Sequence, residues 1–166
     1  GVRGYLHRTA PIAGDGYFVR TGAPDREAVL GMLTAVGLPL VDEAAYDYLR
    51  IEAGQPRFGR ELTLDYIPLE AGLWDDVSFS KGCYVGQEII ARMESRGKLA
   101  KRLVRLRPGA PVDAGVEISA GGRGVGSITS AADGSGGPVA LGYVKTGVLA
   151  GGEPLSAAGV VLTVVE

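Results

Sequence analysis

After Gly97 the chain consists of short apolar runs separated by glycine-rich turns, and this pattern restricts the possible folds more than any other feature. Two of the turns lie at residues 121–124 and 134–138. Short apolar runs with turns at close intervals are typical of a small all-β barrel or sandwich. The apolar positions are Leu103, Leu106, Val112, Val116, Ile118, Val125, Ile128, Val139, Leu141, Val144, Leu155, Val160, Leu162 and Val164.

The glycines at residues 122–126 could also belong to a phosphate-binding loop. A dinucleotide-binding loop has to be followed by a helix. The sequence after residue 126 predicts another strand, so we interpret these residues as strand glycines.

The first half predicts a mixture of strands and helices. Residues 16–20 read as a short strand, and Pro24 suits the first turn of a helix that carries apolar residues at helical spacing. A second helix is expected to begin at Asp42 and to end before Gly54. From residue 58 to residue 79 the periodicity fades, which predicts an irregular connection. The chain as a whole is therefore expected to be α+β.

The only cysteine of the chain lies in the segment Lys81-Gly82-Cys83-Tyr84-Val85-Gly86-Gln87-Glu88. A lone cysteine cannot close an internal disulfide, so it is a buried small side chain, a reactive thiol or a metal ligand. A helix is predicted from Gln87 to Met93. Because a helix N-terminus and an ammonium group both favour the thiolate, the position of Cys83 near Lys81 favours a reactive thiol.

The charge is distributed unevenly along the chain. The segment from Lys81 to Arg107 carries eight basic and two acidic residues, although the net charge of the chain is −2. A basic segment in an acidic protein suggests an anionic ligand or partner, and a solvated surface is the alternative.

Composition excludes several classes of protein. No run of about 18 apolar residues is present, so no membrane contact is expected. One cysteine and one histidine cannot form a zinc or complete iron–sulfur ligand set, so no metal site is expected. The sequence fits a cytoplasmic protein, and a mature organelle protein would look the same.

The segment from Lys81 to Glu88 resembles the signature of the YgfZ family, whose members bind folate and are relatives of the glycine-cleavage T-protein, an aminomethyltransferase. Further similar segments lie at residues 49–54, 68–70, 96–97, 101–103, 126–130 and 140–144, together with Arg92. The resemblance implies a partial α/β folate-binding-type domain at residues 1–97, followed by a small C-terminal antiparallel β-barrel at residues 98–166. It also implies that the N-terminal part of the first domain is missing from this chain.

The same resemblance implies a folate-dependent factor in iron–sulfur cluster assembly or repair, including the maturation of tRNA-modifying enzymes. Its cofactor would be tetrahydrofolate, and its partners would be iron–sulfur client enzymes. An anionic ligand or tRNA would bind the basic surface from Lys98 to Arg107. Cys83 and Lys81 would carry the chemistry; the cofactor-binding residues would be Tyr84, Gly86, Gln87, Glu88 and Arg92.

Two positions depart from the T-protein pattern. Phe18 stands where T-proteins carry an acidic residue that holds the folate ring, and Tyr46 stands where they carry an arginine. Tetrahydrofolate binding by this chain alone is therefore expected to be weak or absent. A tetrahydrofolate-dependent aminomethyltransferase and a non-catalytic fragment that docks partners are the alternative functions.

Overall fold

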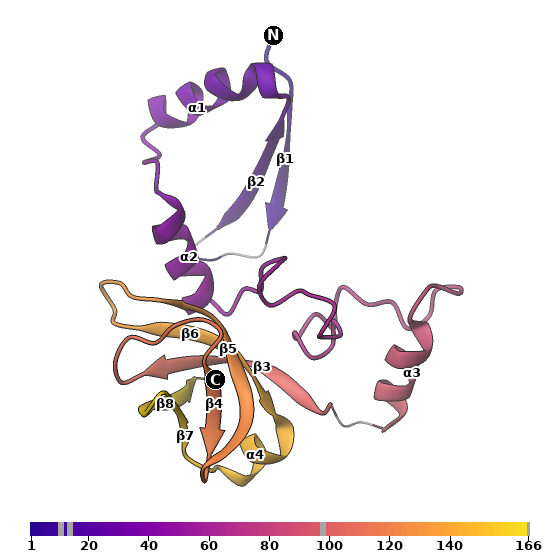
Figure 1. Cartoon of the computed structure of the whole chain (residues 1–166). Coiled ribbons are helices and arrows are strands. Elements are labelled where there is room, and N and C mark those ends of the chain that lie inside the picture. Colours follow the sequence, from indigo (N-terminus) through magenta and orange to yellow (C-terminus); the bar gives the residue numbers. More distant parts are fainter. Residues whose placement is uncertain (10–11, 13–14, 97–98, 166) are drawn as a thin grey trace.

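The structure is a computed structural model that describes residues 1–9, 12, 15–96 and 99–165. The barrel elements follow a first part of two strands and several helices (Figure 1). The first part contains β1 (Gly4–Thr9), β2 (Gly16–Thr21), the 3-10 helix η1 (Ala23–Asp25), α1 (Arg26–Ala35), α2 (Glu43–Glu52) and α3 (Gln87–Arg96).

Strands β1 and β2 form an antiparallel hairpin that stands apart from the barrel with α1 (Figure 1). Pro24 lies in η1, directly before α1, as its fixed φ angle favours. The apolar face of α1 is only half-buried at Val29, Leu30 and Leu33, and Val36 is exposed. This unit contains no fully buried residue among those that the structure describes.

Helix α2 connects the hairpin unit to the barrel. The Asp42 side chain accepts a hydrogen bond of 2.8 Å from the Ala45 backbone N–H, so it caps the helix at the predicted start. At its other end α2 packs Ile51 against Val139 and Leu141 of the barrel.

The second part is a closed barrel in the order β3-β6-β5-β4-β7-β8, in which every pair of neighbours is antiparallel. A short helix, α4, joins β6 to β7. The elements are β3 (Lys101–Pro108), β4 (Glu117–Ala120), β5 (Arg123–Ala132), β6 (Val139–Lys145), α4 (Thr146–Gly151), β7 (Leu155–Ala157) and β8 (Val160–Val165).

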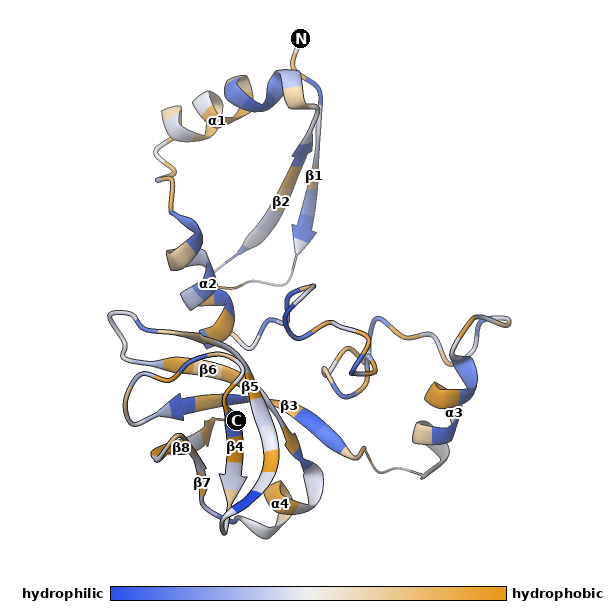
Figure 2. Cartoon of the chain, viewed as in Figure 1, coloured by the Kyte–Doolittle hydropathy of each residue, from blue (hydrophilic) through white to orange (hydrophobic). Residues whose placement is uncertain are grey.

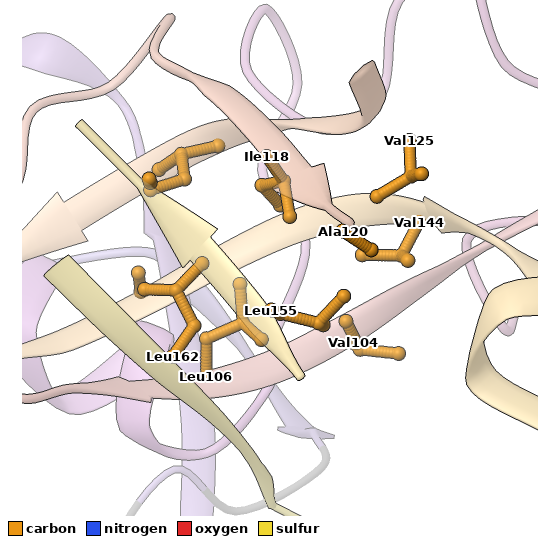
Figure 3. Packing of buried hydrophobic residues seen from close by; sticks show 11 residues of the cluster. Val104, Leu106, Ile118, Ala120, Val125, Val144, Leu155 and Leu162 are labelled. Atoms are coloured by element: carbon orange, nitrogen blue, oxygen red, sulfur yellow. The ribbon is translucent and has the colours of Figure 1, made fainter. Parts of the chain in front are cut away.

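The barrel core gathers buried apolar side chains from all six strands (Figure 3), and on β3, β4 and β7 these side chains lie two residues apart. On β3, for example, Val104 and Leu106 are buried, whereas Arg105 and Arg107 are not. Residues Val139–Val144 of β6 are all buried because α2 and the loop after it cover the outer face of this strand (Figure 2).

The predicted α+β fold with a C-terminal antiparallel barrel is confirmed. Strand β1 and helix α4 were not predicted, whereas β2, α1, α2 and α3 lie where the sequence indicates. The predicted domain boundary falls on Gly97 and Lys98, which lie outside the described residues, and the division at that point stays a prediction. No helix in the described part of the chain is long and apolar enough to cross a membrane.

Candidate functional site

Cys83 is exposed and directly precedes the turn that leads into α3. The Gln87 backbone N–H donates a hydrogen bond of 3.2 Å to the Tyr84 carbonyl oxygen, which closes a β-turn over residues 84–87. Gly86 has a φ angle of +85°, as the third residue of a type II turn requires. Because the Cys83 side chain is exposed, the interpretation of this cysteine as a buried small side chain is wrong.

The side chains of Lys81 and Gln87, two of the predicted site residues, both contact Tyr84 in this turn. The Lys81 Nζ atom lies 4.7 Å from the centroid of the Tyr84 ring, a cation–π arrangement. The Gln87 Oε1 atom accepts a hydrogen bond of 3.2 Å from the Tyr84 backbone N–H. The effect of Lys81 on the Cys83 thiol stays a prediction.

A cavity of about 360 Å³ lies beside this turn. Of the predicted site residues, Lys81, Tyr84 and Gly86 line it together. Glu88 and Arg92 are exposed on α3. Most of the remaining wall is apolar and comes from Leu64, Ile67, Pro68, Val77, Val85, Ile89 and Ile90.

A second, more apolar cavity of about 640 Å³ shares part of its wall with the first, namely Thr63, Leu64, Tyr66, Ile67 and Pro68. Tyr66 and Tyr143 stack in it with ring centroids 3.5 Å apart, and Lys101 Nζ lies 4.2 Å from the Tyr66 centroid. Because Tyr143 covers one face of Tyr66, Lys101 must cover the other. A flat aromatic ligand therefore cannot stack on Tyr66 without displacing Lys101.

Burial raises the pKa of Tyr143, and the neighbouring Tyr66, Glu61 and Glu70 raise it further. The phenol consequently stays neutral and donates a hydrogen bond of 3.0 Å to the Glu61 carbonyl oxygen. Tyr143 is thus a structural donor between the barrel and the loop after α2.

A buried ion pair, which sequence reasoning missed, forms a network with Ser130 that joins three distant segments, and its member Glu61 also lines the second cavity. Arg50 of α2 is 1% exposed and Glu61 is 0% exposed, and their side chains are 2.9 Å apart. Ser130 of β5 accepts a hydrogen bond of 2.7 Å from Arg50 and donates one of 2.6 Å to Glu61. The only signal in the sequence was a charged residue, Arg50, between Leu49 and Ile51, two apolar residues of a helix.

Both carboxylate oxygens of Glu61 accept hydrogen bonds within this network. Its two carboxylate oxygens also accept hydrogen bonds from the Thr129 hydroxyl (2.8 Å) and from the Arg57 backbone N–H (3.0 Å). Arg50 also pairs with Asp47 at 2.6 Å. A buried charge is tolerated only when it is paired and hydrogen-bonded, as it is here. We call Arg50, Glu61 and Ser130 the buried latch.

The predicted basic surface from Lys98 to Arg107 is partly neutralised in the structure. Lys98 lies outside the described residues. Glu52 of α2 pairs with Arg107 at 2.7 Å and, through a hydrogen bond, raises the pKa of that guanidinium. Arg105 donates to the Glu52 carbonyl oxygen, and Arg102 is exposed. Two of these cations therefore help to bind α2 to the barrel, and tRNA binding stays a prediction.

The two positions that depart from the T-protein pattern lie on different elements. Phe18 is 61% exposed on β2 and lines a cavity of about 830 Å³ between the hairpin and α1. Tyr46 is 38% exposed on α2. Among the residues that the structure describes, no group of three or more histidine, cysteine or acidic side chains could hold a metal ion.

Comparison with known proteins gives relatives for both parts of the chain. Residues 101–166 match the family described as the C-terminal beta-barrel domain of CAF17. The chain is 37% identical over 136 residues to a chloroplastic protein of Arabidopsis thaliana named as a transferase, which covers 81% of this chain and 32% of that protein. It is 34% identical over 165 residues to the aminomethyltransferase of Moorella thermoacetica, over 92% of this chain and 44% of that enzyme.

The fold is also similar to a crystal structure, that of the glycine cleavage system aminomethyltransferase T from Bartonella henselae. The TM-score is 0.77 at 27% sequence identity, and the match covers 92% of this chain and 45% of the other. The chain therefore spans less than half the length of each of these three relatives, from 32% to 45%.

Proposed function

We propose that this chain acts as a YgfZ-like factor in iron–sulfur cluster assembly or repair. Its similarity to the C-terminal beta-barrel domain of CAF17 and to aminomethyltransferases supports the proposal. In this proposal Cys83 is the working residue. The observation that carries the proposal is the exposure of this thiol directly before a turn whose residues Tyr84, Val85 and Gly86 line a largely apolar cavity. The cytoplasm is the proposed compartment, although one relative is chloroplastic.

The proposed chemistry needs only a thiol that a partner can reach. In exchange with an oxidised client, the Cys83 thiolate would form one S–S bond, one client S–S bond would break, and one client thiolate would leave. In cluster transfer, the same thiolate would ligate iron together with thiols of the client. Exposure of Cys83 permits both reactions.

Replacing Cys83 by serine tests the proposal. We expect cells that carry Cys83→Ser in the full-length protein to show iron–sulfur enzyme activities as low as cells without the protein. Because the side chain is exposed, the free energy of unfolding should change by no more than about 0.5 kcal/mol.

Ser80→Ala is the matched control, because it changes another small exposed side chain of the same loop. It should support the client enzymes fully. Full support by Cys83→Ser would contradict the proposal and would favour a fragment that only docks partners. Unfolding of Cys83→Ser would show that the cysteine is structural.

The comparisons favour a second candidate, a tetrahydrofolate-dependent aminomethyltransferase, since relatives with this name match most of the chain. We infer that the described residues do not bind folate tightly. Both faces of Tyr66 are covered, and Phe18 and Tyr46 replace the polar groups of the T-protein pattern. Tetrahydrofolate remains the proposed cofactor, held weakly or not at all by this chain alone.

Titration of the chain with tetrahydrofolate separates the two candidates. We expect a dissociation constant weaker than micromolar, because aromatic side chains cannot replace the missing hydrogen bonds to the ring. An authentic T-protein serves as the positive control. The double variant Phe18→Glu/Tyr46→Arg tests whether the two positions alone limit affinity. Micromolar or tighter binding by the unchanged chain would support the aminomethyltransferase.

A further inference from the structure

We propose that a cavity in the wall of the barrel binds a small aliphatic carboxylate, with Arg102 as the side chain that holds the carboxylate group. The cavity has a volume of about 1080 Å³ and lies between the first half of β3, helix α4 and strands β7 and β8. This volume is close to the upper end of the usual range for small-molecule sites, about 300–1,000 Å³. The inference goes beyond the proposed function and does not use Cys83.

The cavity exists because β8 accompanies only part of β3. Strand β8 pairs with residues 105–108 of β3, whereas residues 101–104 pair with β6 alone among the described strands. The Leu103 backbone N–H donates to the Glu70 carbonyl oxygen at 2.8 Å, so it does not need a further strand as a partner. A groove therefore remains between this half of β3 and the segment that runs from α4 into β7.

The walls of the cavity are largely aliphatic. Val104 and Leu155 belong to the buried barrel core (Figure 3), and Val148 and Leu149 of α4 are half-buried. No aromatic side chain is among the described residues that line the cavity. A flat aromatic ligand would therefore find no ring to stack on, whereas an alkyl chain would find apolar contacts.

Arg102 adds a positive charge to this wall. It precedes the buried residues Val104 and Leu106 at alternate positions of β3, so its side chain leaves the strand on the face that points into the barrel. The side chain is exposed and makes no hydrogen bond or ion pair with a residue that the structure describes. A guanidinium binds a carboxylate through parallel N–H···O bonds, so one ligand carboxylate would satisfy Arg102.

The other charged residues of the cavity permit an anion there. Arg105 also lines the wall and donates to the Glu52 carbonyl oxygen. Glu153, the one acidic residue of the described lining, is paired with Arg123 at 3.2 Å. A single anionic group fits this balance better than a polyphosphate or a nucleic-acid backbone, which needs several cations.

Titration of the chain with decanoate, followed by calorimetry at low salt, tests the inference. We expect saturable binding, and a dissociation constant about tenfold weaker for Arg102→Met because charge-assisted hydrogen bonds are lost. Decanol has the same alkyl chain without the charge and should bind both proteins equally. Octanoate should bind about tenfold more weakly than decanoate, since each buried methylene contributes about fourfold in affinity. Arg60→Met is the matched control, because Arg60 is exposed and does not line this cavity.

Two variants of Val161 test the position of the anion without altering Arg102. Val161 lines the cavity and is 66% exposed, so charged substitutions should not disturb the fold. At low salt, Val161→Glu should weaken decanoate binding about two- to threefold, and Val161→Lys should not weaken it. In NMR spectra, decanoate should shift the amide signals of Val148 and Leu149 and should leave that of Val85, an exposed valine outside this cavity, unchanged.

Three results would overturn the inference. Absence of saturable decanoate binding would show that the cavity is not a ligand site. Equal affinities of the unchanged chain and Arg102→Met, or an equal loss in Arg60→Met, would show that Arg102 does not hold the carboxylate. Shifts at Val85 without shifts at Val148 and Leu149 would show that the alkyl chain binds another apolar surface. None of these measurements depends on the outcome of the Cys83→Ser experiment.

Discussion

Replacing Arg50 by methionine is expected to lower the free energy of unfolding by about 3–5 kcal/mol. Glu61 would then remain 0% exposed without its cation, and the Ser130 hydroxyl would lose the guanidinium that it binds. Since the buried latch joins α2, the loop after it and β5, the loss should also separate α2 from the barrel. Urea unfolding followed by circular dichroism measures the change.

The control for this prediction is an exposed ion pair. Arg123 and Glu153 are 3.2 Å apart, and the Arg123 side chain is 71% exposed, so Arg123→Met should cost less than about 1 kcal/mol. The double variant Arg50→Met/Glu61→Gln should be more stable than the sum of the single effects predicts, because the unpaired charge is gone. Equal costs for Arg50→Met and Arg123→Met would show that burial of the pair has no special effect.

Replacing Gly126 by alanine is expected to cost about 3 kcal/mol or more, because a side chain at this position has no space. A Cβ atom on Gly126 would lie 2.0 Å from the Tyr143 carbonyl oxygen and 3.1 Å from the Val144 Cα atom. Both are backbone atoms of β6, which pairs with β5 at this position, so neither can move without opening the barrel. Thermal unfolding gives the change in stability, and loss of soluble protein is the extreme outcome.

Gly124 of the same strand is the matched control. A Cβ atom there would meet the Glu117 carboxylate at 2.3 Å, but this is the end of a flexible, exposed side chain that can turn away. Gly124→Ala should therefore cost less than about 1 kcal/mol. Comparable costs for the two variants would mean that β5 and β6 are not as close at Gly126 as the register requires.

Features governed by neighbouring residues could be predicted from the sequence. Asp42 caps α2, Pro24 lies directly before α1, and the glycine-separated apolar runs form barrel strands. Helix capping, turn chemistry and the alternation of a strand act over a few residues, so the order of residues is sufficient for them. The motif around Cys83 is also a run of neighbouring residues, so the sequence alone is sufficient to identify it.

The remaining features depend on residues that are distant in the sequence. Arg50, Glu61 and Ser130 meet only because α2, the loop after it and β5 pack together, and local periodicity contains no information on that packing. The basic residues of β3 predict a binding surface, but Glu52 of α2 pairs with Arg107 there. The sequence alone determined helices α1 to α3, strand β2, the barrel class and the position of the thiol in the chain. The tertiary structure decided which charges are neutralised and where a side chain has no room, because both depend on register and on contacts between segments tens of residues apart.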